Sequence, residues 1–196
     1  MLIDISIGEG LDRLSILEIK EREIADPGRL VEVRKEIASL GALQSYKERF
    51  VYYYNLILFV NKSIWDLTNT IKRLSYNDAG YGELAHHIFE LNQSRFRLKN
   101  IVNILSESSL REQKSYAVAK KVVCVEETVE DIILLRNLTY LSLIYDAVCI
   151  RTTQTGRQRI ERIIPPFQYT FDCVSEEGVD SLEGVILPAL FKDLPV

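Results

Sequence analysis

The sequence of 196 residues predicts an α+β protein. We expect a helical amino-terminal half, dominated by a long antiparallel helix hairpin, packed on a small carboxyl-terminal α/β unit that contains a βαβ motif. Two observations favour this fold class. Apolar residues recur at alternating spacings of three and four over residues 46–74 and again over 84–105, which is typical of helices. After about residue 118 the period changes, and a strand, a helix and a strand follow within about thirty residues.

The change of period divides the chain into two expected domains. Residues 1–117 form the predicted helical domain, with a short amino-terminal strand and four main helices, and residues 118–196 form the small α/β domain. The first half carries 16 basic and 16 acidic groups, and the second carries 8 and 12. No flexible linker separates the halves, so we expect them to pack together rigidly.

Four helices are expected in the first domain, after an alternating segment at residues 2–8 that predicts a short strand. The first helix covers residues 8–25 and ends before the breaker Asp26-Pro27-Gly28. The second covers residues 29–40, before Gly41. The third is the longest, and after a short turn the fourth returns beside it, which makes the predicted hairpin. The ranges of these last two helices are 46–74 and 83–105.

The second domain begins after a capping-box pattern at residues 109–112, which predicts one more helical turn. A strand is expected over residues 121–126 and a helix from Thr128 to about Tyr145. Two further strands are expected over residues 147–151 and 169–174. Because the first two strands are joined by a helical crossover, we expect them to be parallel.

The composition argues against several classes of protein. The net charge of -4 is unlike that of a protein that binds nucleic acid through a basic surface. The longest mostly apolar run, residues 50–60, is too short to cross a bilayer. The amino terminus lacks the basic start and apolar run of a signal peptide. We therefore expect a cytoplasmic protein with no nucleic-acid partner and no membrane span.

The three cysteines support the same location. Cys124, Cys149 and Cys173 each lie in a short apolar run, and no CxxC pair or neighbouring histidine accompanies them. A metal site with three thiolate ligands is one interpretation. The favoured one is that all three are reduced, buried core residues of strands.

An arginine interrupts the apolar stripe of the fourth predicted helix. Position 95 is the missing member of the stripe and holds Arg95, whereas the other members are Leu84, Ile88, Leu91, Leu98, Val102 and Leu105. An unpaired buried guanidinium is very costly, so it must meet a carboxylate, a carbonyl or a bound anion. Basic residues also outnumber acidic ones over residues 95–121, which marks this stretch as a candidate site.

Two interpretations of this basic cluster stay open. In the first, Arg95 and its basic neighbours bind an anion, because arginine offers planar bidentate donors to phosphate or carboxylate. In the second, Arg97 and Lys99 are solvated, and Arg95 pairs with an internal carboxylate such as Asp66 or Glu9.

The loop over residues 151–157 is a second candidate anion site. It follows the second strand of the βαβ unit, where ligands of open α/β sheets bind, and the next helix offers unpaired N–H groups. Thr153, Thr155 and Arg157 suit a phosphate there. The alternative is a helix-capping loop with solvated arginines.

Carboxylates near the start of the first helix are the candidates for catalysis. Glu9 and Asp12 lie three residues apart and could act as general acid and base or bind a metal. The helix dipole also favours acidic residues there without any function. His86 and His87 show no catalytic or metal-ligand spacing and are expected at the surface. No metal site is predicted and no cofactor is identified.

Several motifs in the first 117 residues resemble an uncharacterised bacterial family. The opening Ile5-Ser6-Ile7-Gly8-Glu9, continued by residues 12–20 (DRLSILEIK), is the most distinctive. Residues 61–66 (NKSIWD), the pattern of Asn92, Arg95, Leu98, Lys99 and Asn100, and residues 114–116 (KSY) also resemble it. The family is a domain of unknown function associated with surface-polysaccharide and glycosyltransferase genes. The resemblance implies a setting in bacterial glycan assembly.

The sequence thus favours binding, and leaves open the processing, of a small anionic ligand such as a sugar phosphate or nucleotide sugar. The competing hypothesis is a non-catalytic interaction module, for example a glycosyltransferase accessory subunit or a homodimer that depends on Tyr53. The sequence does not decide whether a reaction is catalysed; if one is, Glu9 or Asp12 is the expected acid or base. The predicted ligand-binding residues are Arg95, Lys99, Lys114, Tyr116, Thr153, Thr155 and Arg157.

Overall fold

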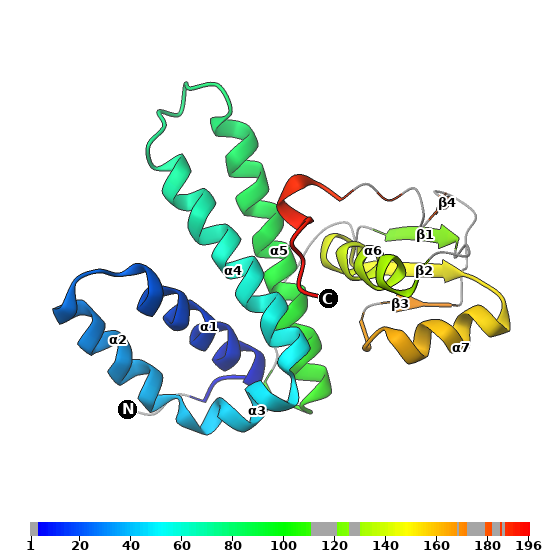
Figure 1. Ribbon diagram of the computed structural model, residues 1–196, viewed down its shortest axis with the longest axis horizontal. Helices are drawn as coiled ribbons and strands as arrows, with labels where there is room; N and C mark the ends of the chain where they lie inside the picture. Colours follow the sequence, from blue (N-terminus) through cyan, green and yellow to red (C-terminus); the bar gives the residue numbers. More distant parts are fainter. Residues whose placement is uncertain are drawn as a thin grey trace. The chain divides into compact units, whose positions relative to one another are not determined.

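The computed structural model (Figure 1) describes residues 4–110, 121–125, 130–167, 169–171, 179–181, 185 and 187–196. The chain is mostly helical and carries a small parallel sheet, in agreement with the predicted α+β class. It divides into two compact units. The first comprises residues 1–113 with Pro195, and the second comprises residues 114–194 with Val196.

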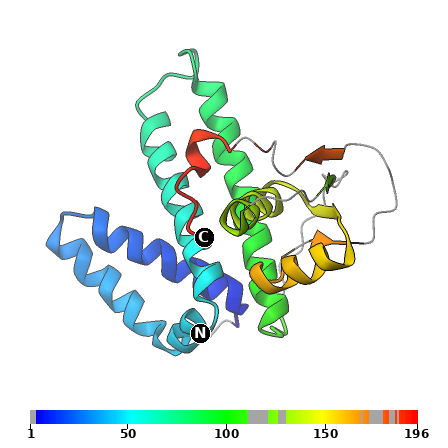
Figure 2. The ribbon, with the colours of Figure 1, turned by 45° about the vertical axis from the view of Figure 1, so that its right-hand side comes forward.

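The first unit is built from helices. Figures 1 and 2 both show α4 and α5 lying side by side, joined by a short connection, and α1 packs against both of them as well as against α2. The elements are α1 (Ile7–Glu23), α2 (Pro27–Ser39), the 3-10 helix η1 (Gly41–Leu43), α3 (Gln44–Arg49), α4 (Val51–Ile71) and α5 (Tyr81–Leu105).

Side-chain caps fix the starts of the first two helices. The Ser6 hydroxyl accepts a hydrogen bond from the Glu9 backbone N–H, and Asp26 caps α2 in the same way. Because Ser6 is the cap and α1 begins at Ile7, the predicted amino-terminal strand is wrong over residues 4–8. Residues 2 and 3 of that prediction lie outside the described residues.

The predicted third helix is in fact two helices, separated at Phe50. The backbone of Phe50 leaves the helical region, at φ -112° and ψ 34°, while its ring is only 7% exposed. The buried ring of Phe50 therefore continues the three-four stripe of α4 into the break. Periodicity did not reveal the break because neither glycine nor proline marks it. The first unit accordingly has five α-helices among its described residues where four were expected.

The core of the first unit lies where α1, α4 and α5 meet. Each of the three helices contributes leucine or isoleucine side chains that are less than 2% exposed. Apolar burial of this kind is the main favourable term in folding. The residues are Leu11, Leu17, Leu56, Ile57, Leu91 and Leu98.

The second unit holds a four-stranded sheet in the order β3-β2-β1-β4, and all neighbouring strands are parallel. The predicted parallel pairing of the first two strands is confirmed, with Lys121 opposite Ala147. The strands are β1 (Lys121–Val125), β2 (Ala147–Arg151), β3 (Tyr169–Thr170) and β4 (Val179–Ser181). The helices are α6 (Asp131–Ile144), α7 (Gln154–Ile163) and the 3-10 helix η2 (Ala189–Phe191).

Two predicted boundaries in this unit differ from the structure. The helix expected from Thr128 begins at Asp131, and its N-cap is Glu130. The third strand is formed over Tyr169 and Thr170, whereas it was expected to reach residue 174. Thr128 and residues 172–174 lie outside the described residues.

The core of the second unit forms between its sheet and its helices. Leu134 and Leu138 of α6 pack with Val148 and Ile150 of β2 and with Ile160 of α7, and each of these side chains is at most 1% exposed. The alternating burial of β2 places Cys149 on the opposite face of the strand.

Cys149 is disulfide-bonded. The prediction that all three cysteines are reduced is therefore wrong for this residue. Its sequence surroundings could not show the bond, because cysteine pairing depends on which distant segments the fold brings together. Cys173 and the side chain of Cys124 lie outside the described residues.

Among the described helices, none combines the length and the apolar character needed to cross a membrane.

Candidate functional site

A buried polar network joins the three central helices of the first unit. Asp12 of α1 is fully buried. Its carboxylate accepts two hydrogen bonds from Arg95 of α5, one from Nε at 2.6 Å and one from Nη2. Asn61 Nδ2 of α4 donates to the same carboxylate at 2.8 Å. One carboxylate thus connects α1, α4 and α5.

Ser15 completes this network. Asn61 Nδ2 donates to its hydroxyl oxygen at 2.7 Å, and the hydroxyl donates to the backbone carbonyl of Asp12 at 2.7 Å. Taking a carboxylate out of water costs several kcal/mol unless a cation and hydrogen bonds compensate for it. Arg95 supplies the cation, and Arg95 and Asn61 supply the hydrogen bonds. The ion pair of Asp12 and Arg95 therefore adds no net charge to the unit.

Neither interpretation of the basic cluster anticipated this partner. The internal pairing of Arg95 was expected with Asp66 or Glu9, whereas the carboxylate found is that of Asp12. Asp66 pairs instead with Lys62 on its own helix. The expectation that two neighbouring cations are solvated is also wrong, because Arg97 is 5% and Lys99 9% exposed. Periodicity had placed only Arg95 on the buried face of α5.

The amino terminus of α1 lies directly against α5. Asn103 Oδ1 accepts a hydrogen bond from the Gly8 backbone N–H at 2.7 Å, and Lys99 Nζ pairs with Glu9 at 2.8 Å. A Cβ added at Gly8 would collide with the Lys99 carbonyl oxygen, so only glycine allows this approach. The side chain of Glu9 is 46% exposed. Glu9 and Asp12, the predicted catalytic pair, are therefore both engaged by cations of α5.

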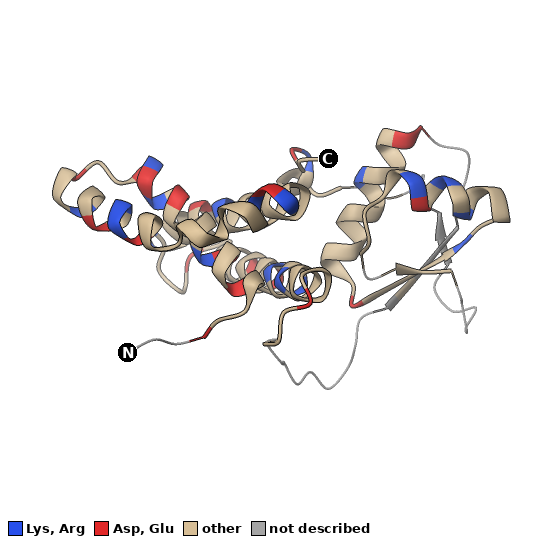
Figure 3. Ribbon diagram, turned by 90° about the horizontal axis from the view of Figure 1, so that it is seen from below, with Lys and Arg blue, Asp and Glu red and all other residues tan. Residues whose placement is uncertain are grey.

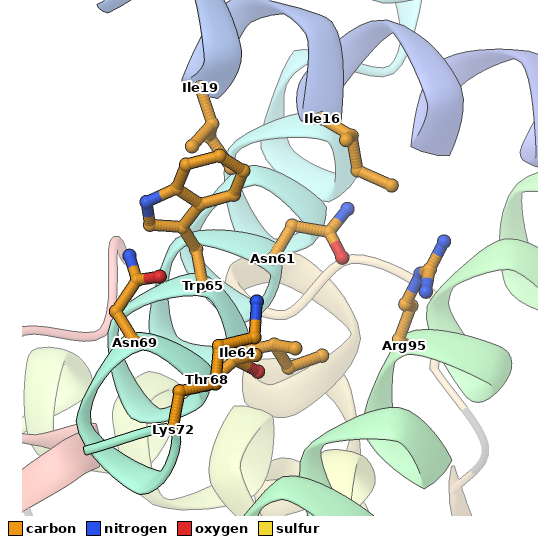
Figure 4. A pocket seen from close by; sticks show the side chains of 9 residues that line it. All are labelled: Ile16, Ile19, Asn61, Ile64, Trp65, Thr68, Asn69, Lys72 and Arg95. Atoms are coloured by element: carbon orange, nitrogen blue, oxygen red, sulfur yellow. The ribbon is translucent and has the colours of Figure 1, made fainter. Parts of the chain in front are cut away.

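A cavity of about 280 Å³ lies beside this network (Figure 4). Trp65, Thr68, Asn69 and Lys72 line it from one face of α4, since residues three, four and seven apart share a helix face. Arg95 approaches from α5, across the cavity from Lys72 in the figure. The complete lining is Ile16, Ile19, Asn61, Ile64, Trp65, Thr68, Asn69, Lys72 and Arg95.

The lining combines an aromatic ring, uncharged polar groups and cations. The half-buried Trp65 offers a flat apolar surface, while Thr68 and Asn69 offer hydroxyl and amide groups. Lys72 is exposed and forms no ion pair with any described residue. Because Asp12 already neutralises Arg95, Lys72 supplies the net positive charge of this cavity.

Most of these residues are not among the predicted site residues. Trp65 appears only within the motif of residues 61–66, and no sequence pattern singled out Thr68, Asn69 or Lys72. The signal that could have found them is the spacing of polar residues three, four and seven positions after the only tryptophan. Acidic and basic residues are interspersed along the helices of the first unit (Figure 3).

The predicted site residues at the end of β2 lie in the second unit and make local contacts. The Thr153 hydroxyl caps α7 by accepting from the Gly156 backbone N–H at 3.1 Å. Arg157 pairs with Glu161 one turn away, and its guanidinium lies 4.8 Å from the ring centre of Phe171. Thr155 is exposed. These contacts match the capping alternative.

Two further predicted ligand-binding residues, Lys114 and Tyr116, lie outside the described residues. His86 and His87 are exposed, as expected. Within the described ranges, no group of three or more histidine, cysteine or acidic side chains is arranged to hold a metal ion.

A comparison with protein families assigns the chain to one of them. The profile described as a family of unknown function matches residues 1–125, more than half of the sequence. The chain belongs to this family, DUF6165. The DUF6165 match covers both the network around Asp12 and the cavity beside Trp65. No curated protein and no solved structure matches the chain. The function of this DUF6165 member is therefore argued from the cavity itself.

Proposed function

We propose that the helical unit binds a small sugar phosphate in the cavity between α1, α4 and α5. The observation that carries the proposal is the cavity lining, where Trp65 stands next to Thr68, Asn69 and Lys72. A sugar ring has an apolar face and a rim of hydroxyl groups. An indole ring, together with hydroxyl and amide groups, complements both, and an ammonium group complements the phosphate.

The volume of the cavity favours a monosaccharide. Pockets for drug-sized ligands measure about 300–1,000 Å³, so 280 Å³ is at the lower limit of this range. A nucleotide sugar, which adds a base, a ribose and a second phosphate, exceeds this space. Of the two ligands considered from the sequence, the sugar phosphate fits better.

The charge balance assigns different roles to the two cations of the cavity. Arg95 forms a bidentate pair with Asp12 and so joins α5 to α1. Lys72 is the C-cap residue of α4 and has no carboxylate partner among the described residues. We therefore assign phosphate recognition to Lys72, with Arg95 as the residue that holds the cavity wall in place.

Binding without catalysis is the better-supported form of this proposal. A general acid or base must reach the proton it transfers. Asp12 is fully buried, and its carboxylate is occupied by Arg95 and Asn61. Glu9 pairs with Lys99 and is absent from the cavity lining. Neither predicted catalytic residue is placed to act on a ligand in this cavity.

The family resemblance of the opening motif supports a sugar ligand. Proteins of the resembled type are associated with surface-polysaccharide and glycosyltransferase genes, so sugar phosphates would be the substrates of their neighbours. On this basis we propose a role in bacterial glycan assembly, in which the protein holds or delivers a sugar phosphate in the cytoplasm.

The alternative, an interaction module that depends on Tyr53, finds no support in the burial of that residue. Tyr53 and Tyr54 are 5% and 1% exposed, so both rings fill the core. Burial and the negative charge of Glu18 raise the pKa of Tyr54 well above its usual range, which keeps its hydroxyl neutral. A dimer that depends on Tyr53 is not compatible with this burial.

Calorimetric titration tests the proposal with three probes: a hexose 1-phosphate, the free hexose and inorganic phosphate. We expect the hexose phosphate to bind more tightly than either fragment, because only it engages both Trp65 and Lys72. Lys72→Met should weaken its binding about tenfold or more, since hydrogen bonds to charged groups contribute about 1.5–3 kcal/mol.

The matched control is Arg73→Met. It removes the same charge from the neighbouring, exposed position, which does not line the cavity. Unchanged affinity in this variant, with loss in Lys72→Met, would support the site. Absence of binding by the wild-type chain, or equal loss in both variants, would refute it.

A further inference from the structure

A second cavity, of about 470 Å³, lies within the α/β unit. Residues of α6 line one side of it and residues of the carboxyl-terminal segment line the other. Among the described residues, the lining carries two cations, one amide and three aliphatic side chains, and no carboxylate. The residues are Ile133, Arg136, Asn137, Val185, Leu187 and Lys192.

The decisive feature is the guanidinium of Arg136. Its Nε atom is buried and has no hydrogen-bond acceptor, and no described carboxylate forms an ion pair with this side chain. A buried donor without an acceptor costs free energy, and a donor on a charged group costs more. Because Arg136 lines the cavity and no described acid neutralises it, an anion that enters the cavity would be its counter-charge.

The acidic residue nearest in sequence on α6 is already engaged. Asp131 Oδ1 accepts hydrogen bonds from Arg159 Nε at 2.8 Å and from Arg159 Nη2 at 2.6 Å. It therefore has a cationic partner on α7, and its carboxylate is not among the groups that line the cavity. Arg159 thus pairs with an internal carboxylate on α6. Arg136, which lies on α6 itself, has no such partner among the described residues.

Two further polar side chains complete the cavity. Lys192, which directly follows η2, adds a second positive charge and is exposed, so it can reorient toward a ligand. Asn137 is 4% exposed and presents an amide at the same cavity. With two cations and no carboxylate among its described lining residues, the cavity is electrostatically suited to an anion.

We infer that this cavity binds the oxyanion of a small organic molecule, either a phosphate monoester or a carboxylate. The planar fork of Arg136 matches both groups, and Lys192 adds a point charge. Ile133, Val185 and Leu187 form an aliphatic wall that suits the rest of the ligand. This inference is independent of the sugar-phosphate proposal, because it concerns a different cavity in the other unit.

The test uses the full-length chain with phenyl phosphate, benzoate and phenol as probes. The first two share a ring and differ in the anion, and phenol carries no charge at neutral pH. All titrations are done in a Lys72→Met background, so that binding at the cavity of the helical unit is suppressed. We expect one or both anions to bind, and the tighter of the two identifies the ligand class.

Three variants locate the binding. Arg136→Met should weaken the anion about tenfold or more and Lys192→Met several-fold, in proportion to the charged contacts removed. Arg162→Met is the matched control, because this arginine is exposed on α7 and lies outside the cavity. If Arg136→Met fails to fold, Lys192→Met still tests the inference, because a substitution at the exposed Lys192 should not disturb folding.

The inference is overturned by any of three results. These are the absence of binding by both anions, binding of phenol as tight as that of the anions, or equal affinities in the Arg136→Met and Arg162→Met chains. Loss of anion binding in Arg136→Met and Lys192→Met, with retention in Arg162→Met, supports it.

Discussion

Arg95 in the helical unit and Arg136 in the α/β unit are both partly buried arginines on long helices, yet their surroundings are opposite. Arg95 meets the fully buried carboxylate of Asp12, and Asn61 supports the same carboxylate. Within the part of the chain that the structure describes, the buried Nε of Arg136 has no acceptor, and no acid lines the cavity beside it.

The difference teaches that a buried cation does not by itself indicate a ligand. Where the chain supplies the counter-charge, as Asp12 does, the pair joins helices and the anion site must be sought elsewhere. Where no described residue supplies one, as at Arg136, an external anion is the better explanation. In the helical unit the ligand site is therefore assigned to Trp65 and Lys72 instead of Arg95.

The largest effect is expected on removing the internal counter-charge. Asp12→Ala leaves the Arg95 guanidinium unpaired at the core, and breaking a buried pair in this way costs about 3 kcal/mol or more of unfolding free energy. Chemical denaturation followed by the fluorescence of Trp65, the only tryptophan, measures the helical unit directly.

Asp66→Ala is the control for this experiment, because Asp66 is half exposed and pairs with Lys62 on the same helix. Its expected cost is about 0.5 kcal/mol or less. Similar costs for the two substitutions would show that the Asp12–Arg95 pair does not hold the helices together.

The next effect concerns the close approach of α1 to α5. Gly8→Ala adds a methyl group against the Lys99 carbonyl, so α1 must shift, at a cost of about 2 kcal/mol. Gly82→Ala on α5 is the matched control, since its Cβ meets nothing and alanine favours the helix. Thermal melting is the measurement. We expect the melting temperature of Gly82→Ala to be at or above that of wild type, and that of Gly8→Ala to be well below it. The reverse order would contradict the close approach of α1 to α5.

A smaller effect tests the loop after β2. Thr153→Ala removes the cap of α7 and should destabilise the α/β unit by about 1 kcal/mol. Thr155→Ala, two residues along on an exposed position, should be nearly neutral. If both variants keep wild-type stability but lose phosphate binding, the loop is a ligand site and the capping interpretation is incomplete.

The smallest effect is expected at Arg136. Arg136→Met removes a buried donor that has no acceptor, so the unfolding free energy should change by no more than about 0.5 kcal/mol or should rise. Hydrogen exchange of the α6 backbone amides in ligand-free protein measures this change in stability at the site of the substitution. A loss as large as that of Asp12→Ala would show that Arg136 has an internal partner, and would remove the contrast between the two units.

Local signals in the sequence predicted much of the fold. Proline and glycine indicated where α1 and α2 end, to within about two residues. The strand at residues 147–151 matches its prediction, because its run of apolar residues ends at Arg151. The break at Phe50 was not predictable, since the buried ring continues the same stripe through it.

The candidate site was less accessible from sequence for a different reason. Periodicity singled out Arg95, but its carboxylate partner lies 83 residues away, and only helix packing brings the two together. The cavity depends on how far α1 stands from α4, which no local pattern encodes. Trp65 and Lys72 are candidates because they line this cavity, which only the folded structure contains.

The most direct test of the account uses Trp65 as its own reporter. The chain has one tryptophan, and it lines the proposed sugar-phosphate cavity. Titration with a hexose 1-phosphate should change its fluorescence saturably in wild type and Arg73→Met, and about tenfold more weakly in Lys72→Met. No change with any sugar phosphate, or identical titrations in all three chains, would contradict the assignment of this cavity.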